Sequence, residues 1–404
     1  MEENREISPL NYDLHEPDDF EELLMSLSEV EENLVDRSTI RCARVCSIFT
    51  VDMAKQCHLN LRGLKRDVAR RNHNAGVKLT EGKEPLSFSV LRYFCATFLK
   101  HNDTEFVFAH TFLLLSWNLM CRAGNTASIH SGHLSWDGDV LAILFGHMKN
   151  DQDGTRPRDA RHVYANPFIP EICPVLSLAI YGAVLGLSNS KLFPGGNQYD
   201  RFSKILKRVM ETEEMKEILA NEGLISERIL FEKGLQPLSL RAPTGGGPSA
   251  AAICIRAGWT LPGVQDTYIR YESAGDRIVG RYVAGLPFDY TGFAILPPFF
   301  PDVDEFVRAN ISLCFNNLPP HLLQTGGFLL ASLVYHCEYV RKVLGPQHPL
   351  YRNPVFGNVE LVSQLKQRVT CRTAWPSDRI RPTGVPPHRS SLPNCNDSRN
   401  RWLN

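Results

Sequence analysis

Residues 258–271 read Gly-Trp-Thr-Leu-Pro-Gly-Val-Gln-Asp-Thr-Tyr-Ile-Arg-Tyr and place Trp259 nine residues before Tyr268. Tyr271 offers a second phenol three residues further on, but the spacing favours Tyr268. Each of these aromatic side chains could simply pack in a core, so their meaning depends on the rest of the chain.

Three basic residues upstream complete an ordered set. Arg122 lies in Cys-Arg-Ala-Gly-Asn after an apolar stretch, Lys149 lies in a polar segment between predicted strands, and Arg241 lies in Leu-Ser-Leu-Arg before a predicted helix. Alone, each has an ordinary explanation, since arginines are common at helix ends and turn lysines are usually solvated. The order Arg, Lys, Arg, Trp, Tyr, with separations of 27, 92, 18 and 9 residues, is much harder to obtain by chance.

These residue types suit the cleavage of a phosphodiester without a metal. A tyrosine can attack phosphorus and keep the bond energy in a new phosphodiester. Two guanidiniums can hold the charge on the non-bridging oxygens, because they are planar and permanently charged. A lysine ammonium can protonate the oxygen that leaves, and the indole N–H of Trp259 can donate to a phosphate oxygen.

The ordered set resembles the signature of tyrosine recombinases, which break and rejoin DNA through a tyrosine. Residues 252–260 and 264–276 resemble the C-terminal part of Crypton-like members, which derive from transposable elements, and the resemblance covers approximately residues 85–286. It implies a helical catalytic domain with a small sheet, an N-terminal DNA clamp, and self-association on double-stranded DNA. It also implies DNA recombination or integration through a 3′-phosphotyrosine, a nuclear location and no cofactor. The catalytic residues that it assigns are Arg122, Lys149, Arg241, Trp259 and Tyr268.

The chain departs from the family pattern at two positions. Leu238 stands where the family has a histidine that supports proton transfer, and Asn125 stands where a carboxylate often orients the first arginine. Loss of a general acid or base typically costs about 10²–10⁴ in rate, so Leu238 predicts a weak or inactive enzyme. A DNA-binding protein that keeps the fold without catalysis is the first alternative, and a helical protein-interaction module is the second.

Composition permits binding to a polyanion. No apolar run approaches the roughly 20 residues that span a bilayer, and the start of the sequence lacks signal-peptide features, so we expect an intracellular protein without a membrane contact. The net charge of zero over 404 residues conceals 13 acidic and 2 basic residues among residues 1–40. This leader carries a net charge of −11, which leaves +11 on the remainder of the chain. A basic body of this kind can bind nucleic acid.

The 11 cysteines form no Cys-x-x-Cys pair. Cys42, Cys46 and Cys57, with His58, come closest to a metal pattern, but no second ligand pair follows at zinc-finger spacing. We expect no metal site and reduced thiols.

Hydrophobic periodicity predicts a mainly α fold with a small antiparallel β-sheet, in the α+β class. Helices are expected over residues 85–100, 104–121, 170–185, 199–215, 249–257 and 322–344, and strands over 133–136, 140–145 and 161–165. The predicted organisation is an acidic flexible leader (1–37), a helical, shortened DNA-clamp segment with a linker (38–82), the catalytic domain (83–287), a helical C-terminal extension (288–375) and a disordered basic tail (376–404). In the clamp segment, four cations at helical spacing either contact phosphates or form a solvated face: Arg62, Lys65, Arg66 and Arg70.

Overall fold

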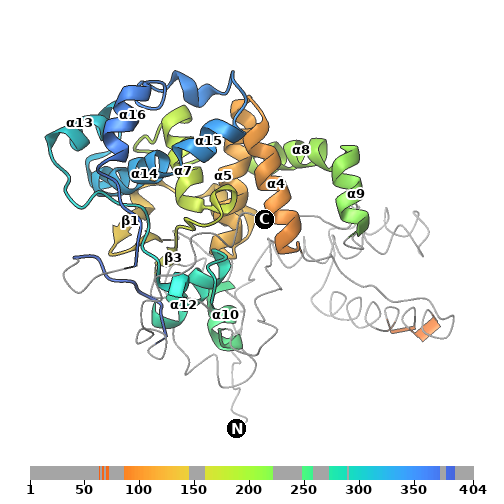
Figure 1. Cartoon of the computed structure of the whole chain (residues 1–404). Helices are drawn as coiled ribbons and strands as arrows, with labels where there is room; N and C mark the ends of the chain where they lie inside the picture. Colours follow the sequence, from red (N-terminus) through yellow and green to blue (C-terminus); the bar gives the residue numbers. More distant parts are fainter. Residues whose placement is uncertain are drawn as a thin grey trace, which may run out of the picture. The chain divides into compact units, whose positions relative to one another are not determined.

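The computed structural model describes residues 86–144, 160–221, 248–257, 273–288, 291–373 and 379–386, together with residues 63, 66, 67, 70 and 71. The chain divides into two compact units, Met1–Glu81 and Gly82–Asn404. Nearly all of the described residues belong to the second unit, whose helices and strands are labelled in Figure 1.

Helix α5 (Thr104–Leu119) is the centre of the second unit. Every side chain from Phe106 to Leu119 is buried, as expected of a helix that is apolar on all sides. The helix begins after Asp103, whose carboxylate accepts a hydrogen bond of 3.0 Å from the backbone N–H of Glu105. It ends at Met120, which adopts a left-handed conformation with φ 51°. The helices that pack around it include α4 (Phe88–Lys100), α7 (Pro174–Leu185) and α8 (Gln198–Met210).

A three-stranded antiparallel sheet packs beside α5, with strands in the order β1 (Leu134–Asp137), β2 (Val140–Ile143) and β3 (Arg161–Val163). The β1–β2 turn has two residues, and its first is Gly138 with φ 61°, a conformation that favours glycine. Strand β3 contacts both α5 and α12 (Ser273–Val283). The prediction of a mainly helical fold with a small antiparallel sheet is therefore confirmed.

The C-terminal helices form one group. They are α13 (Glu305–Cys314), α14 (Leu323–Tyr335), α15 (Cys337–Val343) and α16 (Val359–Lys366). In this group α14 packs against α7 and the others pack on α14. One hydrophobic core contains residues from Leu86 to Leu365, so the predicted extension and the predicted catalytic domain pack as one body. The stretch 322–344, predicted as one helix, is two helices because the backbone leaves helical geometry at His336.

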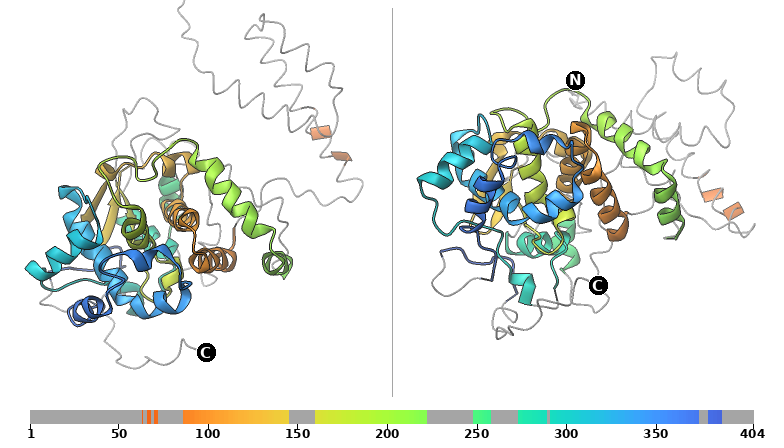
Figure 2. Two further views of the ribbon diagram at one scale, coloured as in Figure 1. Left: turned by 90° about the horizontal axis from the view of Figure 1, so that it is seen from above. Right: turned by 45° about the horizontal axis from the view of Figure 1, so that its top comes forward.

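Helices α8 and α9 (Glu213–Asn221) extend away from the C-terminal helices in all three ribbon views (Figure 1 and Figure 2). Helix α10 (Ala250–Ala257) packs on α12 instead. Among the residues that the structure describes, no helix has both the length and the apolar character needed to cross a membrane.

Residues 379–386 lie within the segment predicted to be a disordered tail, but they take a defined place beside the sheet. Thr383 donates hydrogen bonds to the Asp139 carboxylate from its backbone N–H at 3.1 Å and from its hydroxyl at 2.7 Å. Gly384, with φ 66°, passes so close to Arg277 that a Cβ would lie 2.6 Å from its backbone. The prediction is wrong for these residues, because polar composition does not exclude hydrogen bonds to buried groups.

Candidate functional site

Arg122 is the only proposed catalytic residue in the described part of the chain. The other positions named from the sequence lie outside the described residues: Arg62, Lys65, Lys149, Leu238, Arg241, Trp259 and Tyr268. In the first unit, Arg66 and Arg70 are both exposed, and Arg70 forms an ion pair of 2.7 Å with Asp67. The site is therefore built here from Arg122 and from the described residues that flank the other positions in sequence.

Arg122 immediately precedes helix α6 (Ala123–Ala127), shortly after α5 ends. Its backbone carbonyl accepts hydrogen bonds from the N–H groups of Asn125 at 2.9 Å and Thr126 at 3.2 Å. The Thr126 hydroxyl lies 2.8 Å from that of Ser116, which fixes α6 against α5. The Arg122 side chain is exposed, and it has no hydrogen bond or ion pair with Asn125 or any other described residue. It is a cation on a well-anchored backbone, open to an anion.

A buried carboxylate ties the neighbouring elements together. Asp276, on α12, is 3% exposed and accepts a hydrogen bond of 2.6 Å from Nη1 of Arg256. It also accepts from His162, at 2.9 Å from the backbone N–H and at 2.7 Å from Nδ1. Because an ionised carboxylate can only accept, Nδ1 of His162 carries the proton. Nη1 of Arg161 lies 4.0 Å from the same carboxylate. These four residues are called the Asp276 hub below.

Arg256 extends the hub to the end of α5. Its guanidinium is 1% exposed and donates to the backbone oxygens of Asn118 at 2.6 Å and His162 at 2.9 Å. Arg161 donates to the backbone oxygen of Ile255 at 3.0 Å, so β3 is also bound directly to α10. The hub therefore joins α5, β3, α10 and α12.

The charges in the hub are mutually dependent. Burial alone would raise the pKa of Asp276, but the charge of Arg256 and the hydrogen bond from His162 outweigh it and hold this pKa well below its usual value. The carboxylate is therefore ionised at neutral pH. Packing also requires Gly280 on α12, because a Cβ there would lie 2.4 Å from the backbone oxygen of His162.

The hub residues were not found from the sequence, although one signal pointed to them. Arg256 is a single charge in the apolar run Ile-Cys-Ile-Arg-Ala, at residues 253–257. An arginine in such a run is buried only when it is paired, so the run predicts an acidic partner. It does not say which acid, because Asp276 lies 20 residues away and His162 lies 94 residues away.

A second buried ion pair holds the other end of α12. Arg281 donates to Asp139 at 2.5 Å, and both side chains are fully buried. Arg281 also donates to the backbone oxygens of Phe293, at 2.5 Å, and Thr383. Its guanidinium lies 4.4 Å from the ring centre of Tyr164, whose hydroxyl is 2.6 Å from that of Thr383. Helix α12 is thus fixed by buried charges near both of its ends.

One pair in the core has the atoms of an activated nucleophile but no access to a substrate. The hydroxyl of Ser177 lies 2.9 Å from Nδ1 of His110, and Nε2 of this histidine lies 2.8 Å from the backbone oxygen of Glu171. Ser177 is 1% and His110 2% exposed, and burial lowers the pKa of His110 to about 4. A neutral histidine surrounded by core residues satisfies buried polar groups, so this pair is structural.

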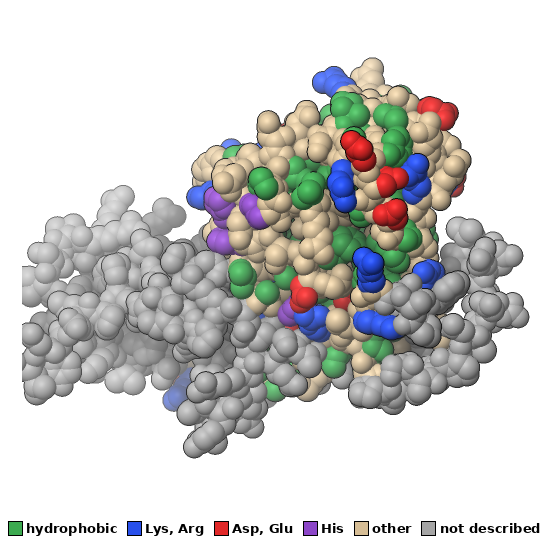
Figure 3. Space-filling model, turned by 90° about the vertical axis from the view of Figure 1, so that its left-hand side faces the viewer, with side chains coloured by type: hydrophobic (Ala, Val, Ile, Leu, Met, Phe, Trp, Pro, Cys, Tyr) green, Lys and Arg blue, Asp and Glu red, His purple; other side chains and the backbone are tan. Residues whose placement is uncertain are grey.

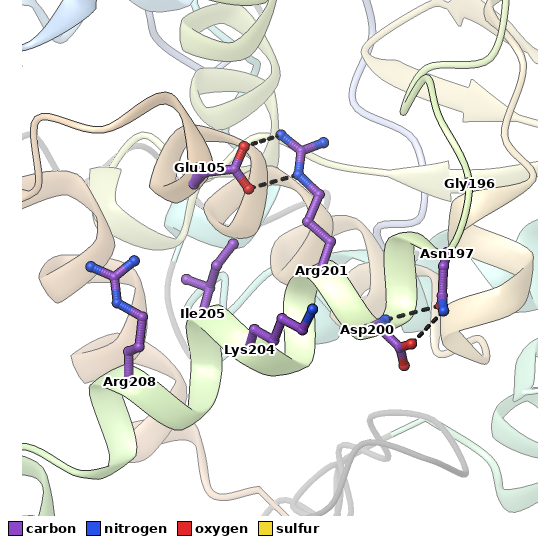
Figure 4. Close-up of a pocket in the computed structure, with 8 residues that line it drawn as sticks. All are labelled: Glu105, Gly196, Asn197, Asp200, Arg201, Lys204, Ile205 and Arg208. Carbon is purple, nitrogen blue, oxygen red and sulfur yellow. Dashed lines mark hydrogen bonds and ion pairs between the residues drawn. The ribbon is translucent and has the colours of Figure 1, made fainter.

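A pocket of about 430 Å³ lies between the start of α5 and helix α8 (Figure 4). Its lining is mostly charged or polar: Glu105, Gly196, Asn197, Asp200, Arg201, Lys204, Ile205 and Arg208. Arg201 donates to Glu105 at 2.8 and 2.6 Å, whereas no contact joins Lys204 or Arg208 to another lining residue in Figure 4. The lining carries three cations and two acids, and one of the cations, Arg201, is already paired with Glu105.

No group of three or more His, Cys, Asp or Glu side chains within the described ranges is arranged to hold a metal ion. No protein-family model, curated protein or solved structure matches the chain. Function is therefore inferred from the residues and their geometry.

Proposed function

We propose that this protein binds duplex DNA and cleaves and rejoins a strand through a 3′-phosphotyrosine at Tyr268. The observation that carries the proposal is the Asp276 hub. It binds together four elements, each of which is close in sequence to a residue of the ordered set. Self-association on DNA, a nuclear location and descent from a transposable element are parts of the same proposal.

The sequence distances from the hub are short. Arg122 follows Asn118 by four residues, and Trp259 follows Arg256 by three. An extended chain spans at most about 3.6 Å per residue, which keeps the Cα atoms of Trp259 and Arg256 within roughly 11 Å. Tyr268 precedes Asp276 by eight residues, and Lys149 precedes Arg161 by twelve. These connections permit four residues of the ordered set, all except Arg241, to meet at one phosphate beside a rigid base, which precise positioning requires.

The proposed reaction needs no bound cofactor. The oxygen of Tyr268 forms a bond to phosphorus, and the bond from phosphorus to the 5′ oxygen breaks. Arg122 and Arg241 hold the charge on the non-bridging oxygens, and the Lys149 ammonium gives its proton to the departing 5′ oxygen. The phenol has a pKa near 10, so its own proton must be accepted for attack at neutral pH. Leu238 cannot accept it, and the proposal therefore includes slow cleavage.

A duplex with sulfur in place of one bridging 5′ oxygen tests this chemistry. A thiol has a pKa of about 8.5 and leaves without a general acid, and as a weak nucleophile toward phosphorus it leaves the tyrosine adduct trapped. We expect a covalent protein–DNA adduct on denaturing gels from a pool of random-sequence duplexes. Tyr268→Phe should abolish the adduct and Tyr271→Phe should retain it. Lys149→Ala should lose activity on the oxygen duplex and keep it on the sulfur duplex.

DNA binding without catalysis is the second candidate, and Leu238 is the observation that favours it. Leu238→His separates the two candidates. If the natural chain forms no adduct and Leu238→His does, the site is intact and only the proton acceptor is missing. If neither chain forms an adduct but both bind duplex DNA, the second candidate replaces the first.

A further inference from the structure

Helix α8 presents a basic face to solvent. Its opposite face is buried in the core through Phe202, Ile205, Leu206 and Val209. Lys204, Lys207 and Arg208 are exposed, and within the described residues none of the three forms an ion pair or hydrogen bond. These three residues are called the α8 face below.

Arg201, on the same helix, does not belong to this face because its charge is already used. It is bound by two hydrogen bonds to Glu105, and its guanidinium lies 3.9 Å from the ring centre of Phe108. Figure 4 shows this pair closed upon itself, while Lys204 and Arg208 extend from α8 without a partner among the residues drawn. The ion pair fixes α8 on α5, and the remaining cations are left for a ligand.

The surroundings of Arg208 show its charge acting on a neighbour. Its guanidinium lies 5.2 Å from the ring centre of Phe106, on which His101 stacks at 3.9 Å. Burial and then the charge of Arg208 lower the pKa of His101. A neighbouring Asp103 acts in the opposite direction but does not reverse the shift. Arg208 therefore lies close enough to His101 for its charge to act on the imidazole.

Helix electrostatics account for only part of the α8 face. Cations in the last turn, such as Lys207 and Arg208, interact favourably with the helix dipole. Lys204 lies one turn earlier, four residues before Arg208 and four residues after Asp200, so it has a like charge on one side and an opposite charge on the other.

The opposite side of the unit differs from the α8 face. On the C-terminal helices, Lys366 pairs with Glu338 and Arg368 pairs with Asp304. Figure 3, which views the left-hand side of Figure 1, shows acidic and basic side chains intermixed there with hydrophobic ones. Paired charges of both signs give no sustained attraction for a polyanion.

We propose that the α8 face binds the phosphate backbone of duplex DNA outside the scissile position. This rests on the proposed function, which supplies DNA as the partner. Lys204 and Arg208 are separated by about 6 Å along the helix axis, so the two side chains can reach neighbouring phosphates of one strand. Helix α8 also packs against α6, which begins directly after Arg122. Helix α8 therefore lies beside the element that begins directly after the proposed phosphate ligand.

Salt-dependent DNA binding tests this proposal. The full chain and a variant with Lys204→Ala, Lys207→Ala and Arg208→Ala are titrated with random-sequence duplex DNA at several salt concentrations. Each lost phosphate contact lowers the slope of log affinity against log salt by about 0.9, so three contacts lower it by up to about 2.7. Between about 50 and 200 mM salt, the full chain should then lose on the order of 40-fold more affinity than the variant.

A matched variant removes three exposed cations, one each from α13, α15 and the 3-10 helix between α15 and α16, with Arg308→Ala, Lys342→Ala and Arg352→Ala. It should keep the slope of the full chain. If the α8 variant also keeps that slope while the full chain binds DNA, the α8 proposal is overturned and the proposed function stands. If the full chain shows no salt-dependent binding to duplex DNA, both fall. Variant-sensitive binding to phosphatidylserine vesicles or polyglutamate, without DNA binding, would assign the face to another partner and overturn the proposal.

Discussion

Replacing Asp276 with asparagine should strongly destabilise the second unit. Asparagine keeps the shape of the side chain but removes the negative charge, which leaves Arg256 buried at 1% exposure with only neutral acceptors. Removing one partner of a buried ion pair costs about 3–5 kcal/mol. At an unfolding entropy of about 2.1 cal/mol/K per residue, a unit that spans Gly82–Asn404 shifts by about 1.5 °C per kcal/mol, so the melting temperature should fall by roughly 4–7 °C. Urea and thermal unfolding of the full chain measure both quantities.

Asp137→Asn is the matched control, because Asp137 also pairs with an arginine on α12, Arg277, but its side chain is 57% exposed. Exposed pairs contribute about 0–1 kcal/mol, so the control should change stability little. Equal losses in the two variants would refute the hub as an energetic centre. Adding Arg256→Met to Asp276→Asn should recover part of the loss, because the unpaired buried charge is then removed.

The stability difference between the full chain and Asp276→Asn should also depend on pH. The folded pKa of Asp276 is held below its unfolded value of 3.8. The stability from the charged carboxylate is therefore present above about pH 4 and is lost as the pH falls through the folded pKa. The difference in unfolding free energy between the full chain and Asp276→Asn should narrow below about pH 4. A difference that stays constant into acid would contradict the charge-based explanation.

Four further changes test separate features. His336 is buried without a partner for Nε2 among the described residues, and burial lowers its pKa from 6.5 to about 4. Between pH 6.5 and 4, the unfolded chain therefore binds more protons at this residue than the folded chain does. The free energy of unfolding should fall by up to about 3 kcal/mol over this range because of His336, and His336→Phe should flatten the pH profile of urea unfolding. Gly280→Ala should destabilise by about 1–3 kcal/mol through its clash with β3, whereas Gly275→Ala on the same helix, with its nearest contact at 3.4 Å, should not. Thr383→Val should cost about 1–3 kcal/mol in thermal unfolding by leaving Asp139 and Tyr164 short of a partner, and Thr383→Ser should restore most of it. Deleting residues 1–40 removes a net charge of −11, so the shortened chain should bind duplex DNA more tightly at low salt and converge with the full chain at high salt; unchanged affinity at low salt would count against electrostatic repulsion by the leader.

The sequence predicts those helices and turns that depend mainly on neighbouring residues. The largely apolar run before Cys121 predicts a central buried helix, and the pair Asp137-Gly138 predicts the turn between the first two strands. The break at His336 has no such signal, because Leu322 to Leu344 is continuously compatible with a helix. The position of this break depends on the burial of His336 and on the packing of α14 against α7, and both are tertiary effects.

In the candidate site too, some features can be read from the sequence and others depend on tertiary contacts. The order of Arg122 and its four companions can be read along the chain, because it consists of residue types and spacings. The hub depends on Arg256 finding Asp276 and His162, and no short-range period encodes such a pairing. The defined place of Thr383 depends on Asp139, which lies 244 residues away.

That long separation has a consequence for the order in which the protein can be completed on the ribosome. Asp139, Tyr164 and Arg281 all leave the ribosome before Thr383 is made. At 5–20 residues per second, the 102 residues from Arg281 to Thr383 take roughly 5–20 s to synthesise. During this interval, the Asp139–Arg281 pair lacks the segment that completes its hydrogen bonds. The nascent chain must therefore keep a charged, partly hydrated interior open until its C-terminal segment emerges, and any chaperone that binds it has this interval in which to act.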